Sequence, residues 1–268
     1  MARMQKNPQK PKFDLFTLYE KAVMSPEADL DFMQRIFKRK RGWGARTFRE
    51  DFCQTGLLAT HWVKKHRDHR SWGIDLNRHA LLWGRRYNFP IVGKRANQVH
   101  LCQENVLHAR VPKVDIACAL NFSYFIFKKR QELLKYFKAA HKGLKGQGIF
   151  FLDIMGGPDI QEEGKDKNRN GYFTYIWDQY DFNPINHDLI CYIHFKLKNG
   201  KTIKKAFTYD WRLWSIPEVR DILLDAGFRE VEVYWEDEDE DGEGTGTYRL
   251  RKNPESTQAW VAYIVAYR

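Results

Sequence analysis

The 268-residue sequence predicts an α/β fold in which a mostly parallel sheet is covered by helices on both faces. Three observations support this prediction. Strand-like and helix-like segments alternate between residues 47 and 154. Three alternating strand patterns then follow one another between residues 172 and 211, with the hairpin dipeptide Asn199-Gly200 between the last two. The alternation of helix and strand resumes after residue 216 and continues to the end.

Residues 1–44 precede this alternation and predict a short basic lead-in followed by two helices. Apolar residues recur at helical spacing at Leu15, Leu18, Tyr19 and Ala22. Ser25 and Pro26 have the residue types of a helix start, and Gly42 is typical of a helix end. We therefore expect the main domain to span residues 45–268.

The elements of the main domain follow from apolar runs and their boundaries. The seven strands expected in the main sheet are Thr47–Phe52, Trp72–Leu76, Val99–Cys102, Asp115–Leu120, Ile149–Ile154, Val231–Trp235 and Trp260–Tyr267. The helices expected between them are Leu57–Lys65, Arg78–Tyr87, Arg130–Leu144 and Pro217–Ala226. The antiparallel insert, residues 172–211, follows the fifth strand. The acidic, glycine-containing segment 236–246 is expected to be a flexible, solvated loop.

Composition narrows the functional classes. The net charge of +11 favours anionic partners, including nucleic acid. The four cysteines include no CxxC pair and lie in apolar stretches, so we expect reduced thiols in a cytoplasmic protein. No apolar run approaches the roughly 20 residues of a membrane helix, and we expect no membrane contact. His61, His66 and His69 lie among lysines and arginines that would repel a cation, so we expect no metal site.

The turn after the first expected strand carries the functional signal. Residues 50–56 read Glu-Asp-Phe-Cys-Gln-Thr-Gly and lead into a helix N-terminus, where unpaired N–H groups are available. Asp75 stands at the end of the second strand, where an acid is placed to accept both hydroxyls of a ribose. Together these features predict an adenosine-type cofactor at the carboxyl ends of the strands.

These residues resemble the class I, Rossmann-like S-adenosylmethionine-dependent methyltransferases, whose first-strand motif is acid-x-Gly-x-Gly-x-Gly. Glu50 matches the acid and Gly56 the last glycine, whereas Phe52 and Gln54 occupy the first two glycine positions. The loop is similar to a bacterial subset with a DFCGT-type sequence. The end of the sequence, with Asp225-Ala226-Gly227-Phe228 before the sixth strand, also resembles this class. The resemblance covers roughly residues 45–268 and implies a seven-stranded sheet.

The resemblance assigns roles by position. It implies S-adenosylmethionine as cofactor and S-adenosylhomocysteine as product. The expected cofactor-binding residues are Arg49, Glu50, Phe52, Cys53, Gln54, Thr55, Gly56, Asp75, Leu76, Glu104, Asn105, Val106 and Asn121. Candidate catalytic residues are Tyr124, Asp153 and His187, and candidate substrate residues are Tyr19, Tyr124, Trp177 and Trp211.

Three functions remain open from the sequence. The first is methylation of a nitrogen or oxygen atom of a small molecule beneath the insert, which resembles the lid of small-molecule N-methyltransferases, by a monomer or homodimer. The second is RNA methylation, with support from the basic stretches at Lys38–Arg41, Lys64-Lys65, Arg85-Arg86 and Lys128–Arg130. The third is a non-enzymatic binding scaffold, in which the substitutions at Phe52 and Gln54 have abolished cofactor binding.

Overall fold

The computed structural model describes residues 8–239 and 244–268. The helices are α1 (Leu15–Val23), α2 (Pro26–Arg41), α3 (Leu57–Lys65), α4 (Arg78–Tyr87), α5 (Arg130–Gly143) and α6 (Ile216–Asp225). The strands of the larger sheet are β1 (Thr47–Asp51), β2 (Arg70–Asp75), β3 (Val99–Gln103), β4 (Val114–Ala119), β5 (Leu144–Gly156), β10 (Glu230–Glu238), β11 (Gly244–Leu250) and β12 (Trp260–Tyr267). A second sheet contains β6 (Gly164–Asn170), β7 (Phe173–Phe182), β8 (Asp188–Leu197) and β9 (Thr202–Arg212).

The larger sheet has the strand order β11-β10-β12-β5-β4-β1-β2-β3, and the second has the order β6-β7-β8-β9. The prediction of a mostly parallel sheet with an antiparallel insert after the fifth strand is confirmed. The expected number of seven strands is wrong, because β11 adds an eighth. Its sequence, GTGTYRL, lacks an apolar alternation, and it is a strand because it pairs with β10.

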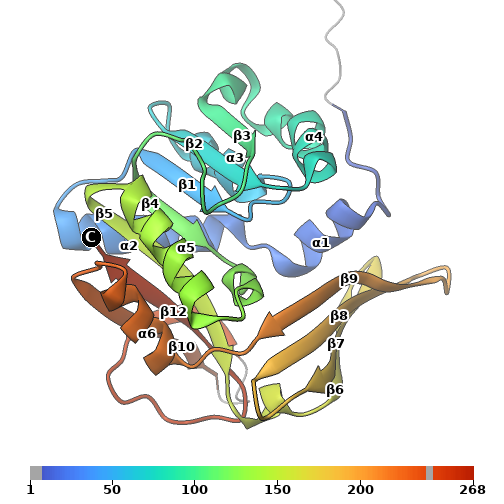
Figure 1. Cartoon of the computed structure of the whole chain (residues 1–268). Coiled ribbons are helices and arrows are strands. Elements are labelled where there is room, and N and C mark those ends of the chain that lie inside the picture. The colour runs from blue at the N-terminus through green and yellow to red at the C-terminus, as the bar shows by residue number, and fades with distance from the viewer. Residues whose placement is uncertain (1–7, 240–243) are drawn as a thin grey trace, which may run out of the picture. The chain divides into compact units, whose positions relative to one another are not determined.

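The chain divides into two compact units. Unit 1 comprises residues 1–119 and 142–149, and unit 2 comprises residues 120–141 and 150–268. In unit 1, β1 pairs in parallel with β2 and β4, and β2 pairs in parallel with β3. Figure 1 shows these strands in blue to green with α3 and α4 beside them. The ring of Trp62 on α3 stacks on Phe48 of β1 at 5.0 Å, which fixes this helix against the sheet.

Unit 2 contains the insert, drawn in yellow to orange in Figure 1. The Asn199-Gly200 turn predicted between β8 and β9 is confirmed, and Gly200 has a φ of 82°. The insert begins with β6, which the sequence did not predict because GKDKNRN has no apolar alternation. β6 is an edge strand held by its ladder with β7.

The acidic segment, residues 236–246, was expected to be a loop. This prediction is wrong for the first and last residues of the segment, which belong to strands. β10 extends to Glu238 and β11 begins at Gly244, and Asp237 forms ion pairs with Arg249 and Arg251 across the hairpin. These cross-strand pairs explain why charged residues extend the ladder. Residues 240–243 of the expected loop lie outside the described residues, as do residues 1–7 of the expected lead-in. No described helix is long and apolar enough to cross a membrane.

Candidate functional site

The turn after β1 adopts a left-handed backbone at alternate residues. Phe52, Gln54 and Gly56 have φ angles of 58°, 48° and 65°. These are the three glycine positions of the methyltransferase motif, so the turn keeps the glycine-type conformation although two side chains are present. A left-handed non-glycine residue costs roughly 1–2 kcal/mol, and such strain persists only where the surroundings impose the conformation.

Neighbouring elements hold this turn in place. The N–H of Cys53 donates to the carbonyl of Ile74 on β2 at 3.0 Å, and the N–H of Gln54 donates to Oδ2 of Asp75 at 2.7 Å. On the opposite side α4 approaches closely at Gly84, where an added Cβ would lie 1.9 Å from the carbonyl oxygen of Thr55. The turn is therefore fixed between β2 and α4.

Asp75 lies beside the turn, as the sequence predicted. Its Oδ1 accepts from the N–H of Asn77 at 2.7 Å, while Oδ2 accepts from Gln54. Burial raises the pKa of the Asp75 carboxyl, and the N–H groups of Asn77 and Gln54 oppose this shift. The N–H of Leu76 also donates to this carboxylate. A carboxylate has about four acceptor positions, so these three N–H donors leave capacity for one hydroxyl group. The next residue, Leu76, is 65% exposed and offers an apolar surface beside the carboxylate.

Glu50 and Arg49 have structural partners in unit 1. Oε2 of Glu50 accepts from the N–H of Ala59 at 2.9 Å, in the first turn of α3, where the N-cap residue Gly56 has no side chain to do so. Burial raises the pKa of Glu50 well above its usual range. Arg49 is buried, pairs with Asp51 at 2.7 Å and donates to the carbonyl of Val106.

The segment after β3 is stabilised by local hydrogen bonds between its own side chains and backbone. Oε2 of Glu104 accepts from the N–H of Arg110 at 2.7 Å, and Oδ1 of Asn105 accepts from the N–H of Leu107 at 2.9 Å. Val106 is buried. Through Arg49 this segment is joined to β1, so unit 1 brings together the turn, the segment after β3 and the end of β2.

A residue that the sequence analysis missed connects α1 to the turn. Oε1 of Glu20 accepts from the hydroxyl of Thr55 at 2.7 Å and from the amide of Asn88 at 2.9 Å, and Oε2 contacts Lys10 at 2.5 Å. Glu20 is only 6% exposed. The sequence pattern did not indicate a role for Glu20, because its two partners lie 35 and 68 residues away in the chain.

In unit 2 the turn after β4 is also left-handed. Asn121 and Phe122 have φ angles of 57° and 54°. Oδ2 of Asp153 on β5 accepts from the N–H of Asn121 at 2.5 Å, and Oδ1 accepts from the N–H of Phe122 at 2.9 Å. Asp153 therefore positions this turn. Tyr124 is fully buried, and burial, reinforced by the charge of Asp153, raises its pKa well above the ordinary value. An ionised Tyr124 is thus disfavoured as a base.

Aromatic rings gather next to this turn on one face of the insert. The ring centroids of Tyr209 and Trp211 lie 4.3 Å apart, and Trp177 lies 5.8 Å from Tyr209 and 6.1 Å from Trp211. Phe122 reaches Trp211 at 6.2 Å. The structure thus brings the predicted Trp177 and Trp211 together with Phe122 and Tyr209, which the sequence did not single out. Trp211 is buried, whereas Trp177 and Tyr209 are half-buried and present surface.

His187 lies in the turn between β7 and β8. Its φ is 60°, its N–H donates to Asn183 at 2.8 Å, and its carbonyl accepts from Leu213 at 2.8 Å. These backbone contacts give His187 a part in shaping the turn. Tyr19 on α1 is buried in unit 1. The catalytic role of His187 and the substrate role of Tyr19 stay predictions.

The fold is that of S-adenosylmethionine-dependent methyltransferases. A methyltransferase of this kind from Clostridium acetobutylicum has 17% identity and a TM-score of 0.66, and the match covers 92% of this chain and 95% of that one. An amino pentose methyltransferase from Micromonospora echinaspora involved in calicheamicin biosynthesis has 13% identity and a TM-score of 0.66, covering 97% and 99%. A sugar N-methyltransferase from a Streptoalloteichus species has 15% identity and a TM-score of 0.63, covering 100% and 98%. No protein-family model and no curated protein sequence matches the chain.

Proposed function

We propose that this protein is an S-adenosylmethionine-dependent methyltransferase that acts on a small molecule. The observation that carries the proposal is the turn after β1, which keeps a left-handed backbone at Phe52, Gln54 and Gly56 and is joined to the carboxylate of Asp75. The turn thus keeps the left-handed backbone path that glycines adopt without strain in the motif. It counts against a scaffold that has lost its cofactor site.

The residues present fit the cofactor. Asp75 retains acceptor capacity for a ribose hydroxyl, and exposed Leu76 provides an apolar surface for the adenine ring. The backbone from Cys53 to Gly56 would lie beside the methionine part. S-adenosylmethionine, when bound, supplies a methyl group on a sulfonium, which an acceptor takes by in-line displacement. The protein then mainly orients the two partners and excludes water. We further propose that the chain belongs to the bacterial subset with the DFCGT-type loop.

The acceptor is assigned to the aromatic rings of Phe122, Trp177, Tyr209 and Trp211. Half-buried aromatic faces bind flat or cationic groups, and an amine that gains a methyl group keeps or acquires positive charge. Solved structures with this fold include a sugar N-methyltransferase and an amino pentose methyltransferase, which agrees with an amine acceptor. The free cysteines suit action in the cytoplasm.

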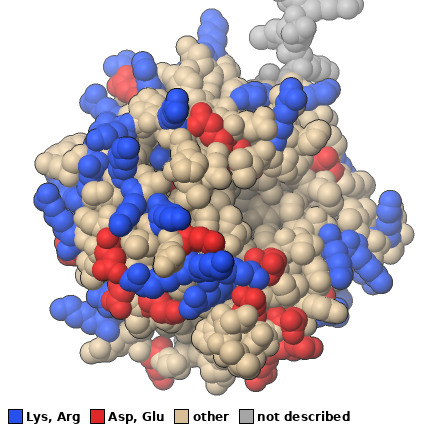
Figure 2. Space-filling view, in the orientation of Figure 1, with Lys and Arg blue, Asp and Glu red and all other residues tan. Residues whose placement is uncertain are grey.

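An RNA substrate has less support, because several basic stretches named from the sequence carry local counter-charges. The pairs are Lys64 with Glu27, Lys65 with Asp31, Lys128 with Asp188 and Asp210, and Arg130 with Asp225. Figure 2 shows acidic side chains among basic ones on the face drawn. Mixed charge weakens the attraction for a phosphate backbone.

The binding test is calorimetric titration with S-adenosylhomocysteine. We expect saturable binding by the wild type and a loss of about tenfold or more in affinity for Asp75→Asn, because an amide can accept at only one of the two positions. Asp221→Asn, at an exposed position on α6, is the matched control and should bind like the wild type. Absence of binding by a folded wild type would overturn the proposal.

The acceptor test measures S-adenosylhomocysteine released during incubation with small amines, amino sugars or an RNA pool. We expect turnover with one of the small amines and a reduced rate in Tyr209→Leu. Turnover that depends on the RNA pool alone would refute the small-molecule assignment and leave the cofactor assignment standing.

A further inference from the structure

The insert carries a hollow of about 440 Å³ at the end of its sheet, and none of the residues proposed above for cofactor or acceptor lines it. Residues of the β6–β7 and β8–β9 hairpin ends line it: Arg169, Asn170, Gly171, Phe173, Thr174, Lys196, Leu197, Lys198 and Gly200. Three of these side chains are cationic and none is acidic. A volume of this size lies within the usual range of small-molecule sites.

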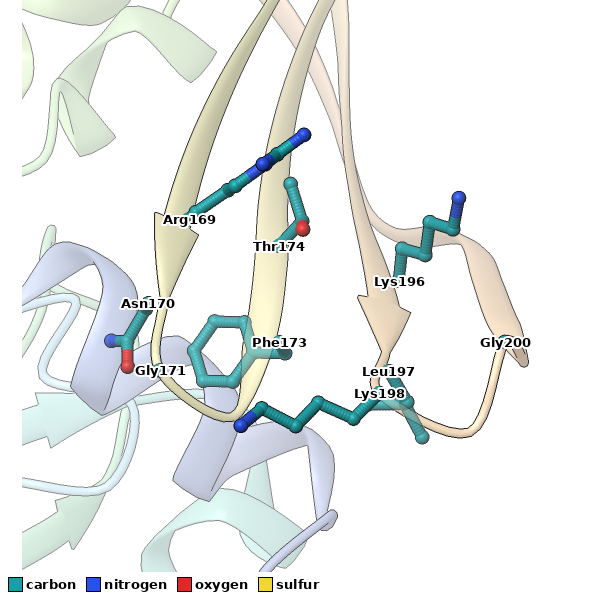
Figure 3. Close-up of a pocket in the computed structure, with 9 residues that line it drawn as sticks. All are labelled: Arg169, Asn170, Gly171, Phe173, Thr174, Lys196, Leu197, Lys198 and Gly200. Carbon is teal, nitrogen blue, oxygen red and sulfur yellow. The ribbon is translucent and has the colours of Figure 1, made fainter.

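The register of the sheet aligns the polar side chains in one row. Arg169 on β6 pairs with Thr174 on β7, and Thr174 pairs with Lys196 on β8. Directly paired residues lie on the same face, so a hydroxyl stands between a guanidinium and an ammonium. Figure 3 shows Arg169, Thr174 and Lys196 extending to the same side of the strands, with Lys198 reaching towards Phe173.

These cations differ from those further along the same face. Lys165 lies four residues before Arg169 on β6 and forms an ion pair with Asp178 at 2.9 Å. Within residues 8–239 and 244–268, no ion pair joins Arg169, Lys196 or Lys198 to a carboxylate. The row nearest the hairpin end thus carries positive charge that no carboxylate of the described residues pairs with, unlike Lys165.

Protection of a sheet edge explains only part of this row. Edge strands commonly carry lysine and arginine to prevent pairing with other sheets, which accounts for the cations of β6. Lys196 lies on β8, which has neighbours on both sides, so edge protection does not require a cation there. Two cations on strands two positions apart are separated by about 10 Å at their backbones, with a hydroxyl donor between them.

We propose that this row binds the phosphate or diphosphate group of a small molecule. A guanidinium suits the planar, two-point contact with phosphate oxygens, and the hydroxyl of Thr174 and the ammonium groups of Lys196 and Lys198 supply further donors. The span between Arg169 and Lys196, which lie two strands apart, fits an anion longer than one phosphate. This inference does not rest on the proposed methyl transfer.

The experiment is calorimetric titration of the full chain with inorganic pyrophosphate at low ionic strength, without cofactor. We expect one saturable site, and an affinity at least about tenfold lower for Arg169→Gln with Lys196→Gln, since each removes a charge-assisted hydrogen bond. The matched control, Lys201→Gln with Lys204→Gln, removes the same charge from exposed positions outside the hollow and should change affinity less than about twofold. The substituted side chains are exposed, and unchanged melting temperatures verify that both variants are folded.

A parallel titration with ADP distinguishes the source of the anion. Tighter binding of ADP than of pyrophosphate, with the same sensitivity to Arg169→Gln and Lys196→Gln, supports a diphosphate carried on a larger molecule. Equal affinities support the free anion as ligand. Equal losses in both double variants would show general attraction to a positive surface and would overturn the site, as would a wild type that binds neither compound.

Discussion

The turns after β1 and β4 lie in different compact units and have the same kind of backbone conformation. Each places non-glycine residues in the left-handed region, and in each an aspartate on another strand accepts the backbone N–H groups. Asp75 accepts one turn N–H and keeps capacity beside exposed Leu76, whereas Asp153 accepts two N–H groups and is 9% exposed. The comparison teaches that the same arrangement, an aspartate that accepts backbone N–H groups of a left-handed turn, lies beside the proposed cofactor surface in the first case and beside aromatic rings in the second.

The largest loss of stability is expected from a substitution at Gly84, which packs against the turn after β1 and not against the turn after β4. Gly84→Ala places a Cβ 1.9 Å from the backbone oxygen of Thr55, so α4 or the turn must move. We expect the free energy of unfolding in urea to fall by about 3 kcal/mol, although alanine favours a helix. Gly146→Ala is the control, because no atom lies within 4 Å of its added Cβ. An unaffected Gly84→Ala variant would show that the turn is not fixed by α4.

The next effect separates the two aspartates. Asp153→Ala leaves two half-buried N–H groups without their acceptor, and we expect a loss of about 2 kcal/mol in the free energy of unfolding. Asp75→Ala removes the acceptor of the N–H groups of Gln54, Leu76 and Asn77, but this site is more exposed and water can replace the carboxylate. Its loss should therefore be about half as large. Denaturant titrations of both variants test this ranking. A larger loss for Asp75→Ala than for Asp153→Ala would contradict the proposed difference between the two turns.

The pH dependence of stability tests the raised pKa of Glu50, which precedes the turn after β1. The folded-state pKa of Glu50 is raised, so its ionisation costs stability as the pH rises through that value. Glu50→Gln keeps an acceptor for the N–H of Ala59 and cannot ionise. We therefore expect the variant to melt at a higher temperature than the wild type at pH 8, and the two to converge at pH 4. A constant difference across this range would contradict the assignment.

The smallest effect compares the strained residues themselves. Gln54→Gly removes a left-handed side chain and should stabilise the protein by about 0.5–1 kcal/mol. Asn121→Gly should gain less, because asparagine tolerates this conformation. Melting temperatures of the two variants give the comparison. Thr55→Gly serves as control and should destabilise, because it removes the hydroxyl bonded to Glu20.

The sequence predicted the parallel strands and the position of Asp75 because both depend on local patterns. Apolar runs mark β4 and β5, and the acid at the end of β2 is read from its place in the chain. The sequence did not predict β6 or β11, whose residues are polar and become strands only by pairing with β7 and β10.

In the candidate site, the residue types were predictable and their partners were not. Glu50 was expected at the cofactor, and that role stays a prediction. Its hydrogen bond from the N–H of Ala59 in α3, whose N-cap is a glycine, was not expected. The left-handed angle at Phe52 could not be read from a bulky side chain, and the link from Glu20 to Thr55 depends on tertiary packing.

That link has a practical consequence for anyone who shortens the protein. A fragment beginning at residue 45, where sequence patterns place the start of the main domain, would lose α1 and with it the carboxylate that receives the Thr55 hydroxyl and the Asn88 amide. Both groups are buried in the intact chain. The Thr55 hydroxyl would be left without this acceptor, and the Asn88 amide would keep only its longer bond to the carbonyl of Thr55. Expression fragments and N-terminal fusions should therefore retain Lys10 and everything after it.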